Sequence, residues 1–155
     1  MKILKFIAFI ALLFGITSCH KSKESFLMTA KINGETISIA TSAYALKTSI
    51  YKDGNPYVNR YIINGLDQNG GFYMWVTDST ALKTEFDFDD FEIVTFSQQE
   101  TEYPIIAANL KIIKENGDLL IGGFNMTAMN GNDTLHVTDG YFELPFENSI
   151  CEYKP

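Results

Sequence analysis

Histidine is scarce in this chain, and its scarcity limits the chemistry that the sequence can support. Two histidines occur, His20 near the N-terminus and His136 in the C-terminal part. The chain therefore has too few histidines to make a histidine-based metal site or a Ser-His-Asp triad a strong expectation. The sequence also lacks a Gly-x-Ser-x-Gly elbow, a His-Glu-x-x-His motif, a glycine-rich phosphate loop and a Cys-x-x-Cys pair. The common enzyme classes that these motifs mark are disfavoured, and we predict no metal ion or cofactor.

Basic residues are also in the minority. The chain has 12 lysines and arginines against 19 aspartates and glutamates, which gives a formal net charge of −7. Nucleic acids and anionic lipid surfaces are bound through basic patches, so neither is an expected partner. An acidic surface most simply keeps the domain soluble.

Long hydrophobic runs are missing except at the N-terminus. Residues 6–16 form an apolar run that is well short of the roughly 20 residues that a membrane-spanning helix needs. The run follows two lysines and precedes the small polar pair Thr17 and Ser18, which is the order of an export signal. We therefore predict that residues 1–18 are a signal peptide.

The sequence Ile16-Thr17-Ser18-Cys19 resembles the lipobox of bacterial lipoproteins. The resemblance implies cleavage before Cys19, a diacylglycerol on its sulfur and an acyl chain on the freed amine. Two or more acyl chains make a durable membrane anchor. Residues 19–25 would then be the lipidated cysteine and a tether. An ordinary secretory signal is the alternative interpretation.

The residues next to Cys19 bear on the location of the protein. Position 20 is histidine and not the aspartate that retains enteric lipoproteins at the inner membrane, so the resemblance implies the outer membrane. Whether the domain faces the periplasm or the cell surface stays open. Lipidation of Cys19 would leave Cys151 without a disulfide partner within the chain, and we predict that Cys151 is a packed thiol.

Residues 26–155 alternate between apolar and polar side chains, with Asn, Asp and Gly at short intervals. This pattern predicts one all-β domain, an antiparallel β-sandwich or barrel of about eight or nine strands. The clearest hairpin turns through Asn33-Gly34, which suits two residues with positive φ. The strands are expected at residues 28–32, 37–39, 44–51, 57–65, 72–77, 92–97, 105–114, 119–129 and 134–146.

The last expected strand changes phase along its length. In a regular strand the inward side chains are either all at odd or all at even residue numbers. Here Val137, at an odd number, and Phe142, at an even number, are both expected to point inward. One residue must be absorbed between them, and Asp139-Gly140 is the natural place for a β-bulge because glycine tolerates positive φ. Pro145 has no amide donor, so we expect this end of the strand at a sheet edge.

Three segments resemble a family of small, uncharacterised lipoproteins common in Bacteroidetes. They are the hairpin at residues 30–34, the glycine-rich residues 122–127 and the closing residues 137–142. Residues 44–102 carry no part of this resemblance. The resemblance implies a lipid anchor and a β domain, and it supplies no substrate and no active site.

Two segments could bind a ligand. Residues 85–92 alternate acids with phenylalanine, but the segment lacks the glycine and the final glutamate of an EF-hand, so we interpret it as a half-buried strand. Tyr73 and Trp75 share one face of a short strand, near Tyr51, Tyr57 and Tyr61, and could stack on sugar rings. The alternative is that both faces of this strand are core or rim.

Two tripeptides, Asp78-Ser79-Thr80 and Asp133-Thr134-Leu135, resemble the O-glycosylation motif of Bacteroidetes proteins. The resemblance implies possible sugars on Ser79 and Thr134, both beside expected loops.

Together these features predict a lipid-anchored outer-membrane protein whose β domain binds a glycan or a partner protein. Two alternatives remain open. A carboxylate-based hydrolase would need two facing carboxylates in a deep acidic cleft. A structural subunit of a larger complex would show a broad apolar patch.

Overall fold

The computed structural model describes residues 27–39, 43–67, 69–80, 83–99 and 101–153, and it confirms the all-β fold. Nine strands correspond to the nine expected from the sequence, and two further strands, β6 and β8, have three residues each. The elements are β1 (Leu27–Ile32), β2 (Glu35–Ile39), β3 (Tyr44–Lys52), β4 (Asn55–Asp67), β5 (Gly70–Asp78), β6 (Glu85–Asp87), the short 3₁₀ helix η1 (Phe88–Asp90), β7 (Phe91–Gln98), β8 (Thr101–Tyr103), β9 (Ile105–Asn116), β10 (Leu119–Asn130) and β11 (Asp133–Glu152).

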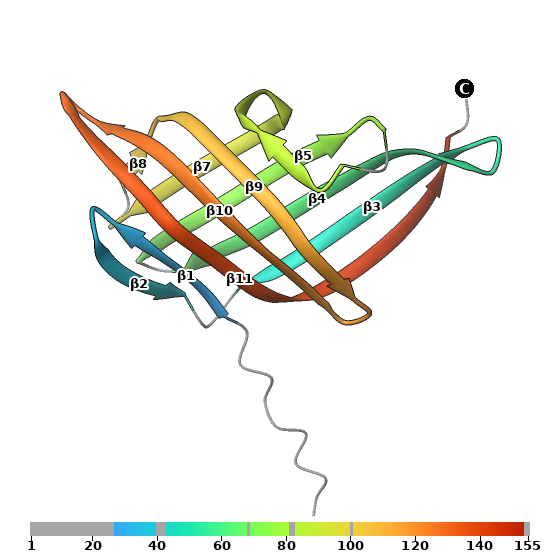
Figure 1. Cartoon of the computed structure of the whole chain (residues 1–155), viewed down its shortest axis with the longest axis horizontal. Helices are drawn as coiled ribbons and strands as arrows, with labels where there is room; N and C mark the ends of the chain where they lie inside the picture. The colour runs from blue at the N-terminus through green and yellow to red at the C-terminus, as the bar shows by residue number, and fades with distance from the viewer. Residues whose placement is uncertain (1–26, 40–42, 68, 81–82, 100, 154–155) are drawn as a thin grey trace, which may run out of the picture.

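The strands form one curled sheet, in the order β6-β9-β10-β11-β3-β4-β5-β7-β8 (Figure 1). The curl places β9 and β10 across β4 and β5, so that two halves of the sheet face each other. Phe72 on β5 meets Phe124 on β10 edge to face, with ring centroids 4.9 Å apart. The hydrophobic core therefore fills the space between the two halves.

The longest strand, β11, joins these halves. It pairs antiparallel with β10, and its middle pairs antiparallel with β1. Its last seven residues pair in parallel with β3, from Phe146 opposite Ala45 to Glu152 opposite Tyr51. This parallel pair departs from the purely antiparallel arrangement that the sequence suggested.

The first hairpin, β1–β2, has the predicted turn. Asn33 has a φ of 48° and Gly34 a φ of 90°, and Ile32 pairs with Glu35 on either side of them. The inward side chains of the hairpin reach the opposite half of the sheet, since a Cβ on Gly65 would lie 2.1 Å from the sulfur of Met28. A glycine at position 65 thus makes room for the hairpin.

The predicted bulge in β11 is also present. Gly140 pairs with Phe124 and Val137 with Met126, so two residues of β11 lie opposite one residue of β10. The positive φ of 52° belongs to Asp139, however, and not to the glycine. Gly140 is needed for a different reason, because a Cβ there would lie 2.3 Å from the carbonyl oxygen of Phe124.

Pro145 lies at a local edge within the sheet, where the strand partners of β11 change. It pairs with Leu119 on one side, and this is the last pair between β10 and β11. On its other side, the pairing of β11 with β1 ends at Glu143 and the pairing with β3 begins at Phe146. Since the Phe146 amide donates to Asp118 on the β10 side, the nitrogen of Pro145 faces the junction between β1 and β3.

Residues 85–92 do not form a single strand. Phe86 on β6 is fully buried, but η1 interrupts the alternation and leaves Phe88 40% exposed. Asp90 accepts hydrogen bonds from the Lys83 ammonium and from the Asp87 amide, which holds this turn closed.

Candidate functional site

Tyr73 and Trp75 share one face of β5, as the alternation predicted, and this is the outward face of the sheet. Phe72, Met74 and Val76 are fully buried on the opposite face. Tyr73 and Trp75 are half-buried, so they belong neither to the core nor to a fully exposed strip. Tyr61 does not join them, because it is only 4% exposed and points into the core.

Trp75 lies in a row of apolar side chains that crosses four strands. Leu46 on β3 is opposite Ile62 on β4, Ile62 is opposite Trp75, and Trp75 is opposite Ile93 on β7. Opposite residues of neighbouring strands point to the same face, with Cβ atoms about 5 Å apart. Ile93 is 42% exposed and the other three side chains are half-buried. We call these four residues the Trp75 row.

Polar side chains border the Trp75 row on both sides. The neighbouring pairs are Asn64 with Tyr73 and Arg60 with Thr77. The Trp75 Nε1 and Thr77 Oγ1 atoms are buried and have no hydrogen-bond partner in the structure. An apolar centre inside a polar margin is the usual anatomy of a protein interface.

A second cluster connects the two halves of the sheet from inside. Lys47 on β3 lies with its Nζ atom 2.9 Å from Glu115 Oε2 at the end of β9, and the Tyr61 hydroxyl donates to Glu115 Oε1 over 2.7 Å. Burial raises the pKa of Tyr61, and the hydrogen bond to the Glu115 carboxylate raises it further. Tyr61 therefore stays a neutral donor. Through Glu115, the side chains of β3 and β4 are bonded to the end of β9.

A groove of about 260 Å³ runs beside β2. Ile32 and residues 37–39 line one wall, and residues 69–71 and 96–98 line the other. It continues into a second hollow of about 350 Å³ that shares Ile32, Ile37 and Gln98 and adds Glu35 and Leu135. We call this continuous depression the β2 groove. Sequence reasoning missed it because its walls come from segments distant in the chain.

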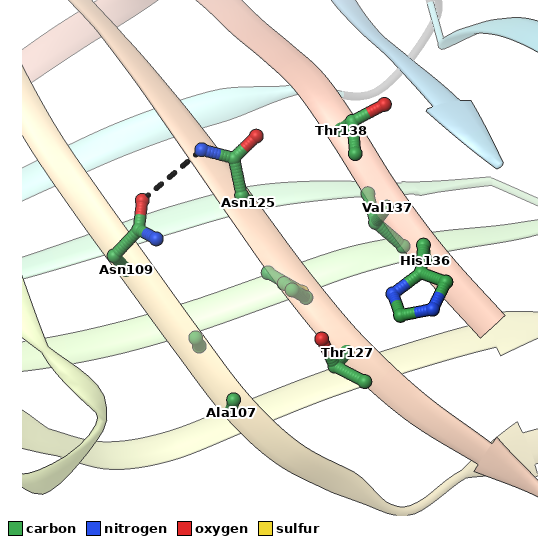
Figure 2. Close-up of a pocket in the computed structure, with 9 residues that line it drawn as sticks. Ala107, Asn109, Asn125, Thr127, His136, Val137 and Thr138 are labelled. Atoms are coloured by element: carbon green, nitrogen blue, oxygen red, sulfur yellow. Dashed lines mark hydrogen bonds between the residues drawn. The ribbon is translucent and has the colours of Figure 1, made fainter. Parts of the chain in front are cut away.

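A shallow depression of about 160 Å³ lies on the outer face of β9, β10 and β11 (Figure 2). His136 and Thr138 border it on β11, and Asn125 donates to Asn109 across it over 3.2 Å. The Asn125 side chain also accepts from the Asp139 amide, so it supports the bulge. The side chains of Asn109 and Asn125 thus bond within the sheet, and His136 is exposed on its outer face.

The remaining predicted sites are dispersed. Ser79 is exposed in the turn after β5, and Thr134 is exposed near the start of β11. Cys19 and its tether lie outside the described residues. Cys151 is exposed, which corrects the expected packed thiol, because β11 extends to Glu152 as an outer part of the sheet.

Over the described ranges, no three His, Cys, Asp or Glu side chains are placed to hold a metal ion. Within the same part of the chain, no helix has the length and apolar character that crossing a membrane requires. Comparisons with protein-family profiles, with curated proteins and with solved structures found no match to this chain.

Proposed function

We propose that this chain is an outer-membrane lipoprotein whose domain acts as an interaction module, with the Trp75 row as the contact surface for a partner protein. The observation that carries the proposal is the in-register alignment of Leu46, Ile62, Trp75 and Ile93 on the outward face of the sheet. Outward positions of an antiparallel sheet are normally polar. An apolar row at four consecutive strands is therefore a feature that folding alone does not require.

Burial of the row by a partner would be favourable. Complete burial of one large apolar side chain contributes roughly 1.5–3 kcal/mol, and tryptophan is enriched among the residues that dominate protein interfaces. The flanking Asn64 and Arg60 offer hydrogen-bonding groups for the margin of such a contact. A glycan is less well supported, because the immediate neighbours of Trp75 are Ile62 and Ile93, which offer a sugar no hydrogen bonds.

The anchor limits where the partner can be. Seven residues, 20–26, separate Cys19 from Leu27 at the start of β1, and an extended chain spans at most about 3.6 Å per residue. The domain would then begin within about 30 Å of the lipid. A partner at the membrane surface, on either side, fits this reach.

The hydrolase alternative has less support. Its site would be a deep cleft with two facing carboxylates. Among the described residues that line the β2 groove, one carries a carboxylate, Glu35.

The test uses a photocrosslinking residue at position 93 and, as a matched control, at position 106. Ile93 and Ile106 are both isoleucines with similar exposure, 42% and 52%, but Ile106 lies on β9. We expect a discrete crosslinked product in membranes from position 93, lost when Leu46 is changed to Asp, and none from position 106. Equal products from both positions, or none from position 93, would contradict the proposal.

The anchor is tested separately. Intact mass and membrane fractionation of the native chain beside a Cys19→Ala variant should show an acylated chain in the outer-membrane fraction and an unlipidated variant outside it. A native chain without acyl mass would remove the lipoprotein part of the proposal and leave the interaction surface to be judged on the crosslinks.

A further inference from the structure

The β2 groove is bordered by a strand edge, so backbone groups as well as side chains face it. Among the described residues, β2 pairs with β1 alone. Figure 1 shows β2 at the margin of the sheet, on the far side of β1 from β11. We infer that the groove binds an extended, positively charged peptide segment of another protein, which adds to β2 as a further strand.

The hairpin register shows which backbone groups β2 offers. The turn has two residues, so Ile32 and Glu35 form the hydrogen-bonded pair that closes it, and bonded pairs then recur at every second residue. Ile37 and Ile39 therefore direct their backbone groups toward β1. Thr36 and Ser38 direct their N–H and C=O groups to the unpaired edge, where they can accept a new strand.

The lining confirms that the groove follows this edge. Ile37, Ser38 and Ile39 all contribute to it, although successive side chains of a strand point to opposite faces. Three consecutive residues can line one hollow only when the hollow runs along the edge of the strand. A peptide in this groove would thus meet the backbone of β2 as well as its side chains.

The shape of the groove fits alternating apolar side chains. One end is closed where Ile39 packs on Gly71, since a Cβ at position 71 would lie 2.7 Å from Ile39 Cδ1. Ile37 and Phe96 supply an apolar floor. The other end opens beside Glu35 and Leu135. An extended peptide could place every second side chain on this floor, as in other complexes formed by strand addition.

Charge indicates what kind of peptide fits. Among the described residues that line the groove, Glu35 is the one that carries a charge, and it lies at the end away from Ile39. A lysine or arginine at the corresponding end of the peptide would pair with it. A second copy of this chain is disfavoured as occupant because its net charge is −7. In an antiparallel arrangement the basic residue would be at the C-terminal end of the peptide, since β2 begins at Glu35.

The experiment measures binding of the amidated peptide acetyl-Thr-Val-Thr-Val-Thr-Lys to the full chain in mild detergent. Its reversed sequence tests the parallel direction. The matched control has the same side chains with alternate backbone amides N-methylated, which removes hydrogen bonds on one edge. We expect N-methylation to weaken binding by about tenfold or more, and replacement of Lys by Glu to weaken it further.

On the protein side, Ser38→Pro removes an amide that β1 does not use, so the hairpin ladder stays intact while the edge loses a donor. Ser38→Thr keeps the amide and is the control. We expect the proline variant to lose binding and the threonine variant to retain it, and the amides of Thr36 and Ser38 to exchange more slowly in the complex.

Three results would overturn the inference: no binding of either peptide direction, equal binding of the N-methylated peptide, or protection of Thr36 and Ser38 that depends on protein concentration without peptide. The last would identify a second copy as the occupant. If Ser38→Pro does not fold, the N-methylated peptide with the unaltered chain still decides the question. Crosslinking from position 93 tests a different face, so the two proposals fail independently.

Discussion

The Lys47 ammonium lies 2.9 Å from the Glu115 carboxylate, which also accepts a hydrogen bond from the Tyr61 hydroxyl. The Lys47 side chain is only 13% exposed. Glu115→Ala would leave both donors without this acceptor and should lower the free energy of unfolding by about 1–3 kcal/mol. Glu115→Gln keeps a side-chain acceptor and should lower the free energy of unfolding by less than Glu115→Ala does. Urea unfolding measures both, with Ile113→Ala, at a 60% exposed position of the same strand, as control.

Gly140 provides a test of the bulge. Gly140→Ala would bring a Cβ to 2.3 Å from the Phe124 carbonyl oxygen, which is backbone and cannot move without disturbing β10. We expect a loss of about 1–3 kcal/mol in the free energy of unfolding. Gly131→Asn is the control, because this residue has a φ of 61° that asparagine tolerates and nothing within 4 Å of a Cβ. Similar losses in both variants would contradict the close approach at Gly140.

The Asp90 carboxyl should make stability depend on pH. Burial alone would raise its pKa, but the hydrogen bond from Lys83, the Asp87 amide and the charge of Lys83 together hold the pKa below the usual 3.8. A carboxyl with a lowered pKa in the folded state stabilises above its unfolded pKa, and this contribution is lost as the pH falls through the folded value. Asp90→Asn should therefore be less stable than the native chain at about pH 7, and the difference should be smaller at about pH 2.5. Urea unfolding at both pH values measures the difference, and an equal difference at both would contradict it.

Cys151 should react readily in the folded protein. Its side chain is exposed on β11, so a maleimide should label it at a rate close to that of the unfolded chain. The Cys19→Ala variant leaves Cys151 as the one cysteine and makes the count unambiguous. If labelling of Cys151 requires denaturant, its thiol is buried, as the sequence predicted, and the exposed position is wrong.

Local features of the sequence predicted local features of the structure well. Asn33-Gly34 forms its turn because both residues can adopt positive φ, and Val137 and Phe142 both face inward because a bulge separates them. That Tyr73 and Trp75 share one face, opposite Phe72 and Met74, also follows from alternation alone.

Features that depend on distant pairing were not predictable from alternation. The Trp75 row forms because Leu46, Ile62 and Ile93 pair in register with Trp75. The register between two strands cannot be predicted from the sequence of either strand alone. The β2 groove likewise needs β2 to lie near residues 69–71 and 96–98. β8 could not be predicted because a strand of three residues is too short to show a period. β6 is the first part of the half-buried strand expected at residues 85–92, which the 3₁₀ helix η1 cuts short.

The place of β11 in the sheet has a consequence for the order in which the chain can fold. Met28 pairs with Phe142 and Ala45 with Phe146, so β1 and β3 each have a neighbour synthesised about 100 residues later. β3 can pair early with β4, but the β1–β2 hairpin reaches the main sheet only through β11, and β11 also joins β3 to β10. A nascent chain of this topology therefore cannot complete its fold until its last strand has been synthesised.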